Sequence, residues 1–506
     1  LDIEYSSQPF FFEEIELIYN GEIYNYQEIR DKLVSLGYKF ETSGDTEVVI
    51  KAFHKWGYKC VDYFDGMFIC IFKLRNKITV ITDHFGEKPL YLLECNNSIY
   101  LCSEAFPLIS TLSIKFDPSI SSIYYFLVNG FMEFENLGFK NLKRIRPGKI
   151  LEISKGKVIN EISYFSRTIK TINSTYNVNN IEEILNKSAA RRLRCDVPMG
   201  IFLSSGVDSV LTTCIINKLY KSDLKCYTAT TGVNDEEYLY AKEICNHLGL
   251  SHEIISSEAI DNTEKVPSDL IDLYTIPNDN TSGLAIANIS SQAAADIKVA
   301  FVGSGADEMF SGYNKYYHIY RNSYLYNTKI INKTVSKLPQ TLNNLIPNRL
   351  NMVKGDLSKR FLTIKNPFLS NYFDYNPKEN LFILNFLNDN DFLSFFRTYD
   401  FNYTLPLSYN ECVDRATMRH SIEARSIYLS KEIFALTSLI SAKSLLKNHP
   451  KPLLRKILSN YLPSNLIPKK KRGFCINFGD FENTFRNKKP NIPSLNKIIN
   501  YTWENL

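Results

Sequence analysis

Hydrophobic and polar positions follow two different patterns along the chain, and the change lies near residue 165. In the first region, apolar residues recur at helical spacing over 26–36 and 47–56, which predicts two helices that end at Gly37 and Gly57. Runs of β-branched residues predict strands at 78–82 and 150–153. The first region therefore predicts an α+β unit with much antiparallel sheet.

The second region follows a polar stretch at 166–180, which is the predicted linker. Strands are expected at 199–203, 225–230, 252–255 and 299–302, and helices at 209–219, 236–248 and 284–296. Nearly continuous apolar strands that alternate with helices are typical of a parallel, doubly wound sheet, whose ligands bind at the carboxyl ends of the strands. Helical patterns continue from about 326 to 506 and are expected to cover this sheet.

Composition narrows the class of protein. A chain of 506 residues predicts two or three domains, and 44% hydrophobic with 22% charged residues is typical of a soluble globular protein. No apolar run is long enough for a membrane helix and the first residues are acidic, so we expect a cytoplasmic protein without a membrane partner. The net charge of +5 does not favour a nucleic-acid partner.

Zinc chemistry has no support in the sequence. The ten cysteines include no CxxC pair, and the seven histidines include no HExxH motif. We expect the cysteines to be reduced thiols, several of them in the core.

The segment SSGVDS, Ser204 to Ser209, lies where a predicted strand passes into a helix. Hydroxyls and free amides at a helix start form an anion site. A phosphate would repel Asp208 unless a divalent cation lay between them, so the motif indicates Mg²⁺. An ordinary N-cap would use the same residue types. GxxxxGK[ST], the usual phosphate loop, is absent.

A second strand end repeats this composition. GSGADE, Gly303 to Glu308, again places small residues before a carboxylate. Two acidic turns at neighbouring strand ends could hold one metal ion between them.

Several motifs together resemble one family, the glutamine-hydrolysing asparagine synthetases. They occur in the family's order and span nearly the whole chain: NGEIYN from Asn20, GDTEV from Gly44, DGMF from Asp65, DHFGEKPLY from Asp83, SSGVDS, GSGADEMFSGY, DRATMRHSIEAR from Asp414 and KKKRGF from Lys469. The resemblance implies a class II glutamine amidotransferase domain of the Ntn-hydrolase type over 1–165, a linker at 166–180, and an ATP-pyrophosphatase domain of the adenine nucleotide α-hydrolase type over 181–506.

The resemblance implies an activity for the second domain. ATP would convert a carboxylate, aspartate in this family, to its acyl-AMP with release of pyrophosphate, and ammonia would then displace AMP. The residues that this assigns to ATP and pyrophosphate are Ser204, Ser205, Gly206, Asp208, Ser209, Thr230, Gly303 and Ser304, with Asp208 and Asp307 on Mg²⁺. Lys471 would neutralise the α-phosphate, although a solvated basic loop is the plainer interpretation. Glu423 and Arg425 could form an internal ion pair or contact substrate.

The first domain would bind glutamine. Asn20 and Gly21 would form the oxyanion hole, and Glu22 and Asp45 would hold the glutamine or its supporting network. A hairpin turn is an alternative use of Asn20-Gly21. The family's nucleophile is an N-terminal cysteine, and the chain as given starts at Leu1, so we expect this polypeptide not to hydrolyse glutamine. Truncation and natural loss both remain open, and the retained motifs favour truncation.

The second domain also departs from the family pattern. Ser205 replaces a glycine, and its Cβ is expected to crowd the loop. Ser304 replaces an acid thought to deprotonate ammonia, and 427–430 replaces Pro-Phe-Leu-Asp. Two alternatives to asparagine formation therefore stay open: a relative that closes a lactam or peptide ring or amidates a sugar acid, and a catalytically silent nucleotide-binding paralogue. A homodimer is possible.

Overall fold

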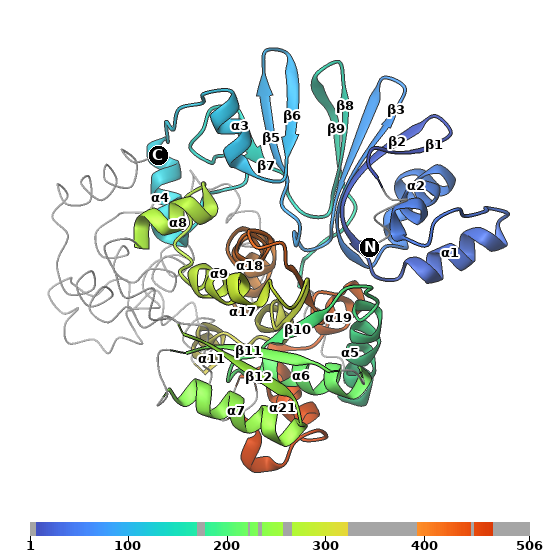
Figure 1. Ribbon diagram of the computed structural model, residues 1–506. Helices are drawn as coiled ribbons and strands as arrows, with labels where there is room; N and C mark the ends of the chain where they lie inside the picture. The colour runs from blue at the N-terminus through green and yellow to red at the C-terminus, as the bar shows by residue number, and fades with distance from the viewer. Residues whose placement is uncertain are drawn as a thin grey trace, which may run out of the picture.

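The computed structural model describes residues 7–169, 178–220, 223–230, 235–256, 266–321, 392–446 and 450–468. These residues form two halves, each built on its own sheet (Figure 1). The first half is antiparallel and the second is parallel.

The first half contains a six-stranded and a three-stranded antiparallel sheet. In sheet order, the larger consists of β1 (Phe10–Phe12), β2 (Ile15–Ile23), β3 (Gly66–Leu74), β4 (Lys77–Thr82), β8 (Lys149–Ser154) and β9 (Lys157–Ser163). The smaller consists of β6 (Ser98–Cys102), β5 (Tyr91–Cys95) and β7 (Leu142–Arg144). Its helices are α1 (Tyr26–Ser35), α2 (Asp45–Trp56), α3 (Ala105–Thr111) and α4 (Ile120–Asn129), with a 3-10 turn at Gly57–Asp62.

Apolar side chains along the strands of the larger sheet point alternately to its two faces, and each face packs into a separate core. Leu17 and Phe72 face a core that includes Ile29 of α1 and Val49 of α2. Residues of β3, β4 and β8 on the opposite face pack with Leu92 of β5. The first half is therefore layered as helices, large sheet and small sheet, an α+β arrangement.

The second half is built on five parallel strands. Their order is β12 (Ser251–Ser256), β11 (Lys225–Thr230), β10 (Met199–Phe202), β13 (Val299–Val302) and β14 (Glu423–Ser426). The helices and helical turns are α5 (Val178–Arg192), α6 (Val207–Leu219), α7 (Glu236–Leu248), α8 (Val266–Tyr274), α9 (Ser282–Ala293), α10 (Ala306–Phe310), α11 (Asn314–Arg321), α17 (Phe392–Tyr399), a π-helical segment (Asp400–Asn410), α18 (Glu411–Met418), α19 (Lys431–Thr437), α20 (Ala442–Leu446), α21 (Pro452–Leu458) and a 3-10 turn (Ser464–Leu466).

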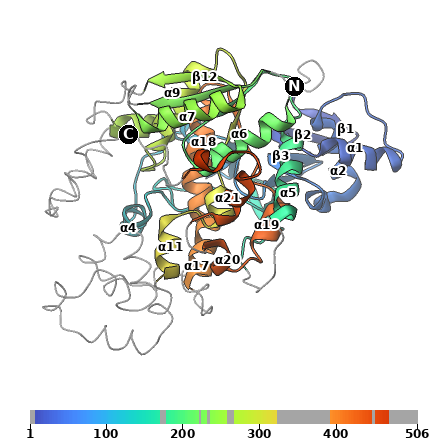
Figure 2. The ribbon, with the colours of Figure 1, turned by 90° about the horizontal axis from the view of Figure 1, so that it is seen from below.

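Helices cover both faces of this sheet, as expected for a doubly wound fold. Ile201 and Phe301 face a core formed with α5, α6, α19 and α21, and Figure 2 shows α5, α6 and α21 side by side. Phe202 and Ala300 face the opposite way, into a core formed with α8, α9 and α18. No helix in the described part of the chain is long and apolar enough to cross a membrane.

Buried ion pairs join the two halves. Arg144 of β7 contacts Glu411 of α18 at 2.6 Å, and both side chains are only 4% exposed. Lys88, which follows β4, contacts Asp414 of the same helix at 3.0 Å. α18 is therefore held on one side by the parallel sheet and on the other by the first half.

Candidate active site

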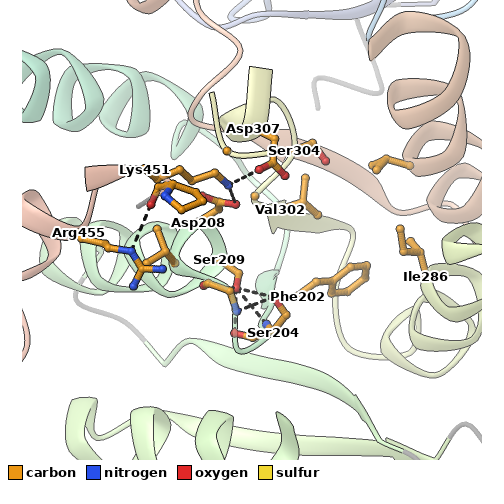
Figure 3. A pocket seen from close by; sticks show the side chains of 16 residues that line it. Phe202, Ser204, Asp208, Ser209, Ile286, Val302, Ser304, Asp307, Lys451 and Arg455 are labelled. Atoms are coloured by element: carbon orange, nitrogen blue, oxygen red, sulfur yellow. Dashed lines mark hydrogen bonds and ion pairs between the residues drawn. The ribbon is translucent and has the colours of Figure 1, made fainter. Parts of the chain in front are cut away.

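The candidate active site lies at the carboxyl ends of β10 and β13, which are neighbours in the parallel sheet. A cavity of about 170 Å³ opens there between the starts of α6 and α10 (Figure 3). Seven residues assigned from the sequence line it: Ser204, Gly206, Asp208, Ser209, Gly303, Ser304 and Asp307. The topology therefore brings both acidic loops to one cavity.

Hydroxyl groups fix the shape of the SSGVDS loop. The Ser204 amide donates to Ser209 Oγ at 3.1 Å, and the two hydroxyl oxygens lie 2.7 Å apart. The N-cap position of α6 is held by Gly206, which has no side chain, so neither serine nor Asp208 serves as the ordinary cap that the sequence left open. The first-turn amides of α6 have no acceptor within the helix, and the positive end of the helix dipole faces the cavity.

Ser205, whose Cβ is expected to crowd the loop, has no backbone strain. It does not have a left-handed φ, and its amide donates to Glu237 Oε1 of α7 at 3.2 Å. Its buried hydroxyl has no hydrogen-bond partner in the described part of the chain. Ser205 is not among the residues that line the cavity.

Gly303 allows the second loop to approach the first. A Cβ at this position would lie 3.1 Å from both Asp208 Cβ and the Ser209 amide nitrogen, which is closer than most real Cβ contacts. Gly305 has φ of 80° and caps α10, a conformation that favours glycine. The two glycines therefore let Asp307 approach Asp208.

Lys451 lies between the two carboxylates. Its ammonium contacts Asp208 Oδ2 and also Asp307 Oδ1, the latter at 2.7 Å. Gly312 makes room for this pair, since a Cβ there would overlap Lys451 Cε and Asp307 Oδ1. Lys451 itself has φ of 55°, a strained value for a residue with a side chain, and precedes Pro452 at the start of α21.

Electrostatics keep the lysine of this cluster ionised. Burial by itself would lower the pKa of Lys451, but the charges of Asp208 and Asp307 and their hydrogen bonds raise it. The lysine is therefore a cation at neutral pH, and the two carboxylates share its charge. Arg455, one helical turn later, adds a second positive side chain to the same wall (Figure 3).

The same two carboxylates suit a divalent cation. Asp208 Oδ2 and Asp307 Oδ1 come from different helices and converge on one positive group, Lys451 Nζ. Carboxylate oxygens are the ligands that Mg²⁺ prefers, and Mg²⁺ usually takes one or two of them together with water and phosphate. In the described residues no group of three or more His, Cys, Asp or Glu side chains gathers into a metal site.

Thr230, like Ser205, is not among the residues that line the cavity. Thr230 ends β11, and its hydroxyl donates to Asp235 Oδ2 at 3.2 Å. Lys471 lies outside the described residues. The alternatives stated for Lys471 therefore stay open.

The EAR motif forms β14, a strand that sequence analysis missed. Arg425 Nε donates to Glu423 Oε1 at 2.7 Å, which is the internal ion pair that the sequence offered as one alternative. Arg425 also approaches Glu22 Oε1 at 3.7 Å, across the boundary between the halves.

The four residues assigned to glutamine gather near this contact. Asn20 and Gly21 lie inside β2 and pair with β3, so the hairpin-turn alternative is wrong. Gly21 has φ of 139°, and a Cβ there would overlap the Met67 carbonyl oxygen. Asp45 Oδ2 accepts hydrogen bonds from the Tyr19 hydroxyl at 2.6 Å and the Ile23 amide at 2.9 Å.

Two partly buried carboxylates in this group have raised pKa values. Burial, Asp45 and Glu423 raise the pKa of Glu22 to about 8, against the opposing effect of Arg425. Burial also raises the pKa of Asp45, although its two hydrogen bonds oppose this. Glu22 therefore tends to hold a proton at neutral pH.

Sequence reasoning missed Lys451 and Gly312 as contributors to the site. Lys451 comes 243 residues after Asp208, and the segment around it is similar to any helix start with proline in the first turn. Gly312 belonged to the GSGADEMFSGY motif, but its role depends on Lys451. Only the three-dimensional arrangement connects them.

Comparisons with known proteins cover both halves. Residues 180–488 match the asparagine synthase family, and residues 1–165 match the glutamine amidotransferase domain. Asparagine synthetase [glutamine-hydrolyzing] 1 of Bacillus subtilis (strain 168) is 26% identical over 517 residues, which are 94% of this chain and 78% of that protein. Asparagine synthetase [glutamine-hydrolyzing] 2 of the same organism is 29% identical over 342 residues, 62% of this chain and 45% of that protein.

Among solved structures, an NH3-dependent NAD synthetase from Campylobacter jejuni is similar over 44% of this chain and 93% of that one. Its sequence identity is 13% and its TM-score is 0.23.

Proposed function

This chain belongs to the asparagine synthase family and is an asparagine synthetase-like ligase, and we propose that its second half activates aspartate with ATP and transfers the aspartyl group to ammonia. The observation that supports this proposal is the Asp208–Lys451–Asp307 cluster at the start of α6. Cationic and anionic groups alternate there beside free helix amides, which is the environment that a polyphosphate and its metal need.

The proposed reaction has two steps. A carboxylate oxygen of aspartate attacks the α-phosphorus of ATP, the bond to the β-phosphate breaks, and pyrophosphate leaves. The nitrogen of ammonia then attacks the acyl carbon, and AMP leaves with the electrons of the C–O bond. Negative charge develops on each phosphate leaving group, so fixed positive groups accelerate both steps.

The residues of the cavity take specific roles in this proposal. The Ser204 and Ser209 hydroxyls and the first-turn amides of α6 bind pyrophosphate, and Gly303 leaves space for it. Lys451 neutralises the oxygens of the leaving group. Asp208 and Asp307 would hold Mg²⁺, which supplies positive charge to the phosphates when bound. Thr230 would lie on the adenosine side and Lys471 beside the α-phosphate.

The replaced segment 427–430 does not argue for another substrate. Its first three side chains are buried, and the Tyr428 hydroxyl donates to the backbone oxygen of Asp208 at 2.8 Å. Ser430 caps α19. The segment supports the SSGVDS loop from behind, which leaves aspartate as the substrate to test first.

Pyrophosphate release tests the proposal. The chain is given Mg-ATP and aspartate, with ammonium as the nitrogen source. We expect aspartate-dependent release, and we expect Asp208→Asn and Asp307→Asn each to lower it by about 10²–10³-fold because each removes a charge from the phosphate site.

A matched control is Asp272→Asn. Asp272 is exposed and pairs with Arg419, so its substitution should leave the rate unchanged. Release that survives in either site variant, or that is absent without a change in ATP binding, would contradict the proposal. The second result would favour a silent nucleotide-binding protein.

A further inference from the structure

A second, much smaller cavity lies where the two halves meet. Its volume is about 20 Å³, which is room for a single water-sized molecule. Met67, Glu87 and Lys88 of the first half line one side of it. The other side is formed by residues of β13, β14, α18 and the segments around them: Val302, Ser304, Asn410, Val413, Asp414, Ala424, Ser426 and Leu429.

This interface cavity adjoins the candidate active site. Val302, Ser304 and Val413 line both spaces. A small molecule in the interface cavity would therefore lie behind Ser304, on the side of the active site that faces the first half.

Glu87 is the unpaired acid of the interface cavity. Glu87 is only 8% exposed, and its Oε1 atom has no hydrogen-bond partner in the described part of the chain. The neighbouring Lys88 ammonium contacts Asp414 instead. A buried carboxylate oxygen without a donor is costly, which indicates that a ligand completes it.

The backbone that carries Glu87 is held in place. The Asp83 carboxylate accepts hydrogen bonds from the four amides of residues 85–88, at 2.5–3.1 Å. Gly86, with φ of 71°, packs against Pro147 and Pro406. The glutamate is therefore presented to the cavity by a rigid turn.

Burial and nearby carboxylates make Glu87 a stronger base than an ordinary glutamate. Burial, Asp83 and Asp65 raise the pKa of Glu87 well above its usual value, while Arg192 and Lys88 oppose the shift. Arg192 donates to Ser188 and to the Leu429 carbonyl rather than to Glu87. A carboxyl with a raised pKa accepts a proton from ammonium more readily than an ordinary glutamate does.

We propose that Glu87 binds ammonium in the interface cavity and takes one of its protons, so that ammonia reaches the acyl carbon past Ser304. This inference rests on the proposed function. It gives the first half a part in the chemistry of the second half, and it supplies the acid that Ser304 lacks.

Ammonium loses two protons in the proposed reaction, the first to Glu87 and the second to AMP. Ammonium enters and the resting Glu87 gives up its own proton to solvent, so the carboxylate pairs with the cation. One N–H bond then breaks, its proton bonds to Glu87, and ammonia is left with a free electron pair. That pair forms the C–N bond as the C–O bond to AMP breaks, and the nitrogen passes its remaining surplus proton to the phosphate of AMP.

The interface cavity has room for the proposed nucleophile. A space of about 20 Å³ accepts a molecule the size of ammonium. The inference therefore concerns the formation of a primary amide.

Glu87→Gln tests this role, because it keeps the size of the side chain and removes its basicity. Two reactions are measured: ATP–pyrophosphate exchange with aspartate, which reports activation alone, and ammonium-dependent asparagine formation. We expect exchange within about threefold of wild type and asparagine formation lower by about 10²-fold at neutral pH. The remaining rate should rise about tenfold per pH unit, in step with free ammonia.

Glu133→Gln is the matched control. Glu133 also lies in the first half, is partly buried and has a raised pKa, but it does not line the cavity. Its variant should keep the wild-type rate and pH profile.

Unchanged asparagine formation with an unchanged pH profile in Glu87→Gln would overturn the inference. Absence of exchange in the wild type would instead contradict the proposed function. If Glu87→Gln does not fold, Glu87→Asp decides the matter. The shorter acid reaches ammonium less well, so asparagine formation should fall, by less than in a variant without the acid, while ATP–pyrophosphate exchange stays within about threefold of wild type. A wild-type rate of asparagine formation would again overturn the inference.

Discussion

Acidic side chains gather in two places, and the two clusters hold their protons differently. Asp208 and Asp307 share the Lys451 ammonium, which keeps charge in the cluster. Glu22 and Asp45 are partly buried beside each other, Arg425 approaches Glu22 at 3.7 Å, and the pKa values of both carboxyls are raised. The same residue types therefore form a cluster around a paired cation in one half and a cluster with raised pKa values in the other.

The difference shows that the distance to a cation influences whether a carboxyl group is ionised or neutral. A cation within hydrogen-bond distance stabilises the ionised form, whereas burial without one favours the neutral form. Substitutions in or beside the two clusters should therefore have different effects on activity and stability.

The largest effect is expected from Lys451→Met, which keeps the apolar stem and removes the cation. Pyrophosphate release should fall by about 10²–10³-fold, because the leaving group loses its fixed positive charge and two carboxylates are left to repel it. Steady-state assays at saturating Mg-ATP measure this. A rate within threefold of wild type would show that the lysine is only a structural counter-ion.

Gly312→Ala should weaken the same cluster from outside. The added Cβ overlaps Lys451 Cε and Asp307 Oδ1, so the lysine must move while every charge is retained. Pyrophosphate release should fall by about tenfold, since a displaced positioning contact costs less than a deleted one. Wild-type activity in this variant would mean that the lysine is free to adopt another position.

Glu22→Gln probes the cluster with raised pKa values through stability. The pKa of Glu22 is raised from 4.5 to about 8 on folding, so the stability that its neutral form provides is complete below pH 4.5 and is lost as pH rises towards 8. The glutamine variant stays neutral and should be more stable than wild type by about 1–2 kcal/mol at pH 8, but not at pH 5. Thermal unfolding at both pH values measures this, and parallel pH profiles for the two proteins would contradict it.

The smallest effect is expected from Ser205→Gly. The serine fits the loop without a left-handed φ, so restoring the family's glycine should change the KM for ATP by less than about threefold. A gain of tenfold or more would mean that the Ser205 side chain does obstruct pyrophosphate.

Local sequence pattern was sufficient for much of the fold. The strands 225–230 and 299–302 and the helix 236–248 have the bounds expected from the sequence, because continuous apolar runs and an Asp cap are local signals. β14 escaped this reasoning because Glu423 and Arg425 are charged, and their burial depends on an ion pair rather than on apolar character. A short strand with charged side chains lacks the apolar pattern from which strands are predicted.

The residues of the candidate site also fall into those that the sequence predicts and those that it does not. The acidic loops could be placed at one sheet edge because parallel strands end together. Lys451 and Glu87 could not be found, since each becomes significant only through partners distant in the chain: Asp208 for the lysine, and Ser304 across the interface for the glutamate. Side chains contributed by distant segments need the folded structure.

The proposed reaction depends on the activation of a carboxylate by ATP at the Asp208–Lys451–Asp307 cluster. The most direct test follows the fate of oxygen from aspartate labelled with heavy oxygen in its side-chain carboxylate, in a reaction with Mg-ATP and ammonium. The account predicts one labelled oxygen in AMP, because that oxygen bonds to the α-phosphorus. Unlabelled AMP alongside newly formed asparagine, or label in pyrophosphate, would contradict it.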